Sequence, residues 1–112
     1  MSQSPKSPDP GEIAVDAAEA IRRVGAAEAW LLDVREVYEW QTGHAEAAHH
    51  IPMGEVASRR EELPVDKPIL VICHSGQRSR QVMDALLRAE YSAANVEGGM
   101  DAWQAAGGDV IR

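Results

Sequence analysis

Short apolar runs alternate along the chain with segments in which apolar residues recur every three or four positions. The runs 29–34 and 69–72 contain no polar residue except Asp33, which lies near the end of the first run. Runs of this kind are typical of strands buried in a parallel sheet. Weaker patterns predict three further strands at 12–15, 49–51 and 95–97.

Segments with helical spacing separate these strands. Asp16, with Glu19 three residues later, is a typical start for the first helix, and Gly25 can end it. Further helices are expected at 36–41, 53–62, 79–90 and 99–106. Strands that alternate with helices predict parallel pairing and an α/β layered domain. Binding sites in such sheets form beyond the carboxyl ends of the strands, where Asp33 and Cys73 would lie.

The length of 112 residues predicts a single domain that buries a core without disulfide bonds. Residues 1–11 contain three prolines, three serines and almost no apolar side chain. They are therefore expected to form a disordered tail. The folded domain is expected to cover residues 12–112.

The composition argues against several functional classes. The net charge of −7, from 11 basic and 18 acidic residues, makes nucleic acid an unsuitable partner. No apolar run approaches the ~20 residues that cross a bilayer, and the N-terminus lacks the apolar core of a signal peptide. A single cysteine cannot form an internal disulfide or a cysteine-rich zinc site. It fits a reducing compartment, so the expected location is the cytoplasm.

That cysteine stands at the most informative place in the chain. Cys73 closes the run 69–72 and is followed by a polar loop with one glycine, then by Arg78 and a helical segment. A strand, loop and helix in this order bring backbone N–H groups together at a helix N-terminus, where an anion is favoured. A lone cysteine is most often a small buried hydrophobic residue. The polar loop and Arg78 instead favour a thiol with a lowered pKa.

Several segments together resemble the rhodanese-type sulfurtransferases, in particular the small single-domain members. The loop from Cys73 to Arg78, with four residues between them, resembles the family's active-site loop. The resemblance covers roughly residues 12–110, and Ala45 departs from it where isoleucine is common. The remaining matching segments are 33–36, 39–40, 43–48, 51–52, 98–99, Trp103 and Gly107.

This resemblance implies a two-step sulfur transfer on a small parallel sheet flanked by helices on both faces. The Cys73 thiolate would take the outer sulfur of thiosulfate or a persulfide donor and pass it to cyanide or a thiol. Arg78 would bind the anionic donor or brace the loop, and Asp33 with Arg35 would form an ion pair or loop brace near the site. The implied substrate-binding residues are His74, Ser75, Gly76, Gln77, Arg78 and Ser79.

The resemblance also implies no metal and no organic cofactor. Its partners would be small sulfur donors and acceptors, with thioredoxin or a sulfur-carrier protein as further possibilities, and the chain is expected to be a monomer. Two alternatives stay open. Cysteine phosphatases and arsenate reductases on the same fold carry a loop one residue longer, and non-catalytic binding modules of this family usually lose the cysteine.

Other polar residues have simpler interpretations. His74 serves equally well as an anion-binding, proton-shuttling or solvated residue. The spacing of His44, His49 and His50 does not form a metal site on one helix face, so surface or structural roles are expected. Glu36 and Glu39 are interpreted as members of a solvated helix face.

Overall fold

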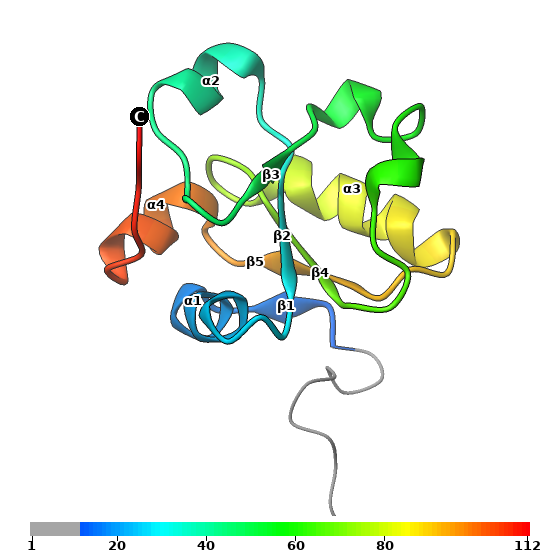
Figure 1. Cartoon of the computed structure of the whole chain (residues 1–112), viewed down its shortest axis with the longest axis horizontal. Helices are drawn as coiled ribbons and strands as arrows, with labels where there is room; N and C mark the ends of the chain where they lie inside the picture. The colour runs from blue at the N-terminus through cyan, green and yellow to red at the C-terminus, as the bar shows by residue number, and fades with distance from the viewer. Residues whose placement is uncertain (1–11) are drawn as a thin grey trace, which may run out of the picture.

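The computed structural model describes residues 12–112, so the tail predicted at 1–11 lies outside the described residues. Within this range, five strands form one sheet in the order β1-β5-β4-β2-β3, and every neighbouring pair is parallel. Figure 1 shows the sheet crossing the molecule, with helices packed around it. The strands are β1 (Ala14–Val15), β2 (Trp30–Asp33), β3 (His49–His50), β4 (Ile69–Ile72) and β5 (Ala93–Val96).

Within the described range, three helices and two short 3₁₀ turns connect the strands, and a fourth helix follows β5. Asp16 caps the first helix as predicted, because its Oδ1 accepts a hydrogen bond from the backbone N–H of Glu19 at 2.8 Å. None of the helices within residues 12–112 has the length and apolar content needed to cross a bilayer. The helices are α1 (Ala17–Gly25), α2 (Val37–Gln41), α3 (Gln77–Arg88) and α4 (Gly99–Ala105).

The helix predicted at 53–62 is wrong. The chain there forms two separate 3₁₀ turns, η1 (Met53–Glu55) and η2 (Arg60–Glu62), joined by a turn. Gly54 weakens an α-helix at this position, and Val56 is the only residue of the segment that is buried in the core. One buried side chain does not give the continuous apolar face that stabilises a longer helix.

The core has two halves, one on each face of the sheet. Alternation along β4 separates them, because Ile69, Val71 and the following Cys73 face α3 and η1. Leu70 and Ile72 face the other way, toward α1 and α4. This arrangement confirms the predicted fold class, a parallel sheet with helices on both faces.

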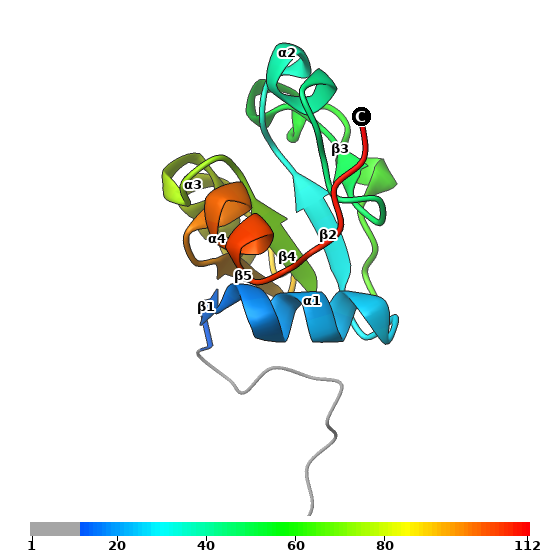
Figure 2. The same ribbon diagram turned by 90° about the vertical axis from the view of Figure 1, so that its left-hand side faces the viewer.

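The sheet register brings two predicted site residues to one end of the molecule. Asp33, the last residue of β2, pairs with Ile72, which directly precedes Cys73. Beyond that end lies α2, which follows β2 and stands apart from the sheet in both views (Figures 1 and 2). The loop after β4 and the short helix α2 therefore lie at the same end of the sheet, where the carboxyl ends of the strands meet.

Candidate active site

Cys73 lies at the bottom of a tight loop between β4 and α3. Residues 74–76 form a bend, and α3 begins at Gln77 with Gly76 as its N-cap. Gly76 has φ = 108°, a left-handed conformation that side chains rarely adopt, so glycine is required there. Its backbone N–H points at the Cys73 Sγ at 3.1 Å. The thiol therefore faces the amides of the loop, and Cys73 is only 1% exposed.

Two opposing effects set the acidity of this thiol. Burial raises the pKa of Cys73, because the charged thiolate loses solvation. Hydrogen bonds from the Ser79 hydroxyl and from the backbone N–H groups of Ser79, Gly76 and Ser75 favour the thiolate and outweigh that effect. The pKa of Cys73 consequently lies below its ordinary value, as expected for a reactive cysteine rather than an inert one.

Ser79 connects the thiol to a residue that the sequence analysis missed. Its Oγ lies 3.3 Å from Sγ and is also hydrogen-bonded to Asn95 Oδ1, while Asn95 Nδ2 donates to the Gly76 carbonyl at 3.3 Å. A hydroxyl carries one proton, so Ser79 donates to the sulfur or to Asn95 at any moment. The position of Asn95 in the otherwise apolar strand β5 could have indicated this role, because a buried asparagine side chain needs hydrogen-bond partners inside the protein.

Replacing Ser79 by alanine is expected to raise the pKa of Cys73. The variant removes a hydrogen bond that favours the thiolate, while burial continues to favour the thiol. The rate of alkylation by iodoacetamide, measured as a function of pH, should therefore rise at higher pH than in the wild type. Ser75→Ala is the matched control because it keeps its backbone N–H. Superimposable pH profiles for Ser79→Ala and the wild type would contradict the role of the hydroxyl.

The loop is anchored from behind by α4. The backbone N–H groups of Met100 and Asp101, in the first turn of α4, donate to the carbonyls of Cys73 at 2.7 Å and His74 at 3.3 Å. Gly99 makes this approach possible, because it has φ = 59° and a Cβ on it would lie 2.6 Å from the His74 carbonyl carbon. The glycine pair at 98–99 thus positions the Cys73 loop, although it lies 25 residues away in sequence.

Asp33 and Arg35 form a buried ion pair at the end of β2. The Arg35 guanidinium donates to both Asp33 oxygens, at 3.0 Å from Nε to Oδ1 and 2.8 Å from Nη2 to Oδ2. The same guanidinium also donates to the carbonyls of Gly43 at 2.8 Å and Glu39 at 3.3 Å. These bonds tie α2 and the segment after it to the end of the sheet.

Arg78 has a partner that the sequence analysis did not anticipate. It lies in the first turn of α3, and both of its terminal nitrogens donate to the Glu39 carboxylate of α2. The interpretation of Glu39 as part of a solvated helix face is therefore wrong, because its side chain is only 18% exposed. The contact spans 39 residues of sequence, so no local pattern could reveal it.

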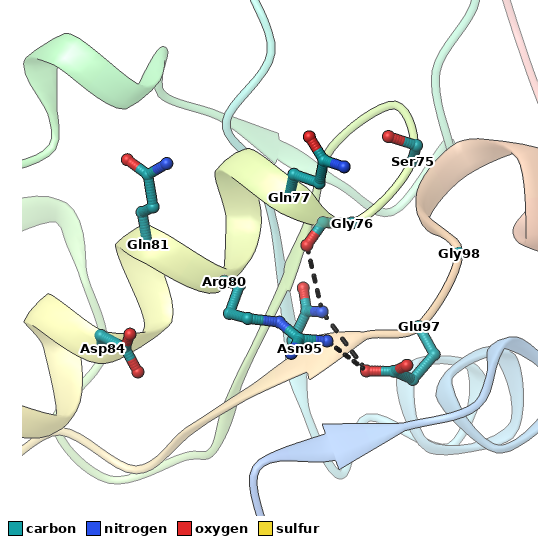
Figure 3. Close-up of a pocket in the computed structure, with 9 residues that line it drawn as sticks. All are labelled: Ser75, Gly76, Gln77, Arg80, Gln81, Asp84, Asn95, Glu97 and Gly98. Atoms are coloured by element: carbon teal, nitrogen blue, oxygen red, sulfur yellow. Dashed lines mark hydrogen bonds and ion pairs between the residues drawn. The ribbon is translucent and has the colours of Figure 1, made fainter.

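The remaining predicted loop residues surround the thiol from outside. His74 is exposed, with its Nε2 3.5 Å from the Asp101 carboxylate, while the side chains of Ser75 and Gln77 face solvent. A cavity of about 500 Å³, lined mainly by polar residues, adjoins the loop on the side of α3 and β5 (Figure 3). Its lining residues are Ser75, Gly76, Gln77, Arg80, Gln81, Asp84, Asn95, Glu97 and Gly98.

The histidines beyond the loop stack on tryptophans. Trp40 stacks with His44 at 3.5 Å and with His50 at 4.6 Å between ring centroids, and Trp30 stacks with His49 at 4.0 Å. Within residues 12–112, no group of three or more His, Cys, Asp or Glu side chains is arranged to hold a metal ion. These histidines therefore contribute to packing at the edge of the sheet.

Comparisons with known proteins place the chain in a family. The model of the Rhodanese-like domain matches residues 16–106. The Bacillus subtilis protein named "Putative sulfurtransferase YtwF" is 43% identical over 77 residues, which cover 69% of this chain and 75% of that protein. A second Bacillus subtilis protein, "Putative sulfur carrier protein YrkF", is 39% identical over 74 residues. That match covers 65% of this chain and 40% of the relative, so this chain spans less than half of it.

A solved structure agrees with this assignment. The crystal structure of a rhodanese-related protein from Thermoplasma volcanium has a TM-score of 0.81 and 30% identity, over 88% of this chain and 97% of that one. The resemblance predicted from the loop and its flanking segments is therefore confirmed over most of the described residues. The chain belongs to the rhodanese-like domain family.

Proposed function

We propose that this chain is a sulfurtransferase that carries a sulfane sulfur as a persulfide on Cys73. In the first step, the Cys73 thiolate attacks the outer sulfur of the donor, the new S–S bond forms, and sulfite leaves thiosulfate or a thiolate leaves an organic persulfide. In the second step, cyanide or an acceptor thiolate attacks the outer sulfur of the Cys73 persulfide. Thiocyanate or a new persulfide leaves, and the Cys73 thiolate returns.

The observation that carries this proposal is the ring of donors around Sγ. The Gly76 N–H at 3.1 Å and the Ser79 hydroxyl at 3.3 Å stabilise negative charge on sulfur before any substrate arrives. A persulfide anion carries its charge on sulfur as well, so the same backbone N–H groups suit both states of the cycle. The loop has only three residues between Cys73 and the start of α3, a small enclosure that favours one sulfur atom over a tetrahedral phosphate.

The relatives support the same chemistry at a coarser level. One is named as a sulfurtransferase and another as a sulfur carrier, which favours sulfur transfer and a protein partner that hands sulfur on. Our proposal extends this to Cys73 as the carrier, with a small molecule, thioredoxin or a sulfur-carrier protein as partner. A reducing cytoplasm would keep the lone thiol available.

The proposal is tested by assaying the wild-type protein with two donors, thiosulfate and cysteine persulfide, each with cyanide or a thiol as acceptor. Turnover with at least one donor is expected, and prior alkylation should abolish it, because iodoacetamide has a single cysteine to modify. The competing function, a cysteine phosphatase, predicts hydrolysis of an aryl phosphate instead. Aryl phosphate turnover without sulfur transfer would refute the proposal.

A further inference from the structure

The ion pair between Glu39 and Arg78 is a bridge between α2 and the helix that follows the Cys73 loop. Arg78 Nη1 lies 2.7 Å from Glu39 Oε1, and Nη2 lies 2.8 Å from Oε2, so each nitrogen has its own oxygen. This bidentate geometry is the strongest form of an arginine–carboxylate contact. Both side chains are partly covered, with 32% of Arg78 and 18% of Glu39 exposed.

The pair is fully charged at neutral pH. The hydrogen bonds from Arg78 lower the pKa of Glu39 to about 2, so this carboxylate stays ionised under any neutral assay condition. The Glu39 carboxylate raises the pKa of Arg78, and the charge of the Cys73 thiolate adds to that effect. Arg78 lies in the first turn of α3, directly after the Cys73 loop, and its charge is already compensated by Glu39.

Every basic side chain from residue 74 to residue 80 has a carboxylate beside it. Arg80 lies 3.3 Å from the Glu97 carboxylate, an ion pair marked in Figure 3, and His74 lies 3.5 Å from the Asp101 carboxylate. The carboxylates come from three separate places in the fold: α2, the residue directly after β5, and α4. The chain as a whole also carries a net charge of −7. An anionic donor therefore meets no uncompensated cation at the loop among the described residues.

This charge pattern discriminates between donors of different charge. Thiosulfate carries two negative charges, and both must approach the loop. An organic persulfide, R–S–S⁻, brings at most one negative charge at its reacting end. The penalty for a second charge is larger where an opposing carboxylate neutralises the nearby guanidinium.

We propose that Glu39 is a specificity-determining residue that sequesters Arg78, disfavours dianionic donors and adapts the site to organic persulfides. The inference rests on the proposed function of Cys73. The favoured first step is Cys73–S⁻ + R–S–S⁻ → Cys73–S–S⁻ + R–S⁻, in which one S–S bond forms, one breaks, and charge is conserved. Glu39 acts through Arg78 and takes no part in the bond changes.

The test compares kcat and KM for thiosulfate and for cysteine persulfide in wild type and Glu39→Gln. The amide keeps an oxygen that can accept the hydrogen bond from the backbone N–H of Glu36, 2.9 Å from Glu39 Oε1. It removes the negative charge that compensates Arg78 and replaces Oε2 by an NH₂ group that cannot accept from Nη2. We expect kcat/KM for thiosulfate to rise about tenfold, mainly through a lower KM, as one freed charge at contact distance predicts. The kcat/KM for cysteine persulfide should change by less than about threefold.

Three variants separate this role from simple bracing of the loop. Glu39→Asp keeps the charge and should behave as wild type. Glu62→Gln makes the same chemical change in an exposed pair with Arg59, and it should leave both donors unaffected. Adding Arg78→Gln to Glu39→Gln should remove the gain with thiosulfate. The gain should also shrink at about 0.5 M salt, because exposed charges are screened there.

The outcomes distinguish this inference from the proposed function. If Cys73 accepts sulfur from cysteine persulfide in the wild type, but Glu39→Gln gives no gain with thiosulfate, the role of Glu39 is refuted and sulfur transfer stands. A parallel loss with both donors in Glu39→Gln would also refute it, since that is the result expected of a brace. Absence of transfer from either donor in the wild type would refute both proposals.

Discussion

A Gly99→Ala variant is expected to lose both stability and sulfur transfer. A Cβ at this position would overlap the Cys73 carbonyl oxygen and would lie 2.6 Å from the carbonyl carbon of His74, both of which belong to rigid backbone. The left-handed conformation, at φ = 59°, costs an alanine about 1–2 kcal/mol, and the overlap adds about 1–3 kcal/mol. We therefore expect the free energy of unfolding to fall by about 2–5 kcal/mol in urea denaturation.

The effect on activity follows from the displaced loop. The Cys73 and His74 carbonyls accept from the first turn of α4, so moving them shifts the backbone N–H groups that surround Sγ. A displacement near 1 Å reduces rates by about a hundredfold in well-ordered sites, and we expect a loss of that order in the folded protein. Gly25→Ala is the control, because a Cβ there meets nothing within 4 Å. Wild-type stability and rate in Gly99→Ala would contradict the anchoring role of α4.

An Arg35→Met variant is expected to lose about 3–5 kcal/mol of the free energy of unfolding. The substitution leaves the Asp33 carboxylate, which is 0% exposed, without its cation. It also removes the bonds that hold the Gly43 and Glu39 carbonyls. Truncating one partner of a buried ion pair costs more than the pair itself contributes, because an uncompensated charge stays in the interior.

A double variant tests that explanation directly. Asp33→Ala combined with Arg35→Met removes both charges, so it should recover at least about 1 kcal/mol relative to Arg35→Met alone. Arg60→Met is the control, since Arg60 is exposed and its loss should change stability by less than about 0.5 kcal/mol. A loss below about 1 kcal/mol in Arg35→Met, measured by urea denaturation, would show that the pair is not a structural brace.

Local patterns predicted the features that depend on neighbouring residues. Each of these features depends on only a few consecutive residues, and the structure has them where expected. They are the apolar run of β4, the polar bend after Cys73 and the helix cap at Asp16. The family resemblance rested on the same local segments. The α/β fold followed from the alternation of strands and helices, because parallel strands need crossover connections.

The contacts that shape the site were beyond such reasoning. Glu39 meets Arg78 across 39 residues and Ser79 meets Asn95 across 16, so neither pair shares a strand or a helix. A charged residue on a short helix indicates a solvated face until the fold brings a partner to it, as it does for Glu39. The helix predicted at 53–62 was wrong for a different reason. The local sequence favoured a helix, but the segment has no continuous apolar face that could pack against the core.

Intact-mass spectrometry shows whether Cys73 carries the transferred sulfur. After incubation with cysteine persulfide or thiosulfate, the wild type should gain the mass of one sulfur atom, and a thiol acceptor should remove it. Cys73→Ser should gain none. Sulfur transfer to the acceptor with no mass added to the wild type, or the same mass gain in Cys73→Ser, would show that Cys73 is not the sulfur carrier.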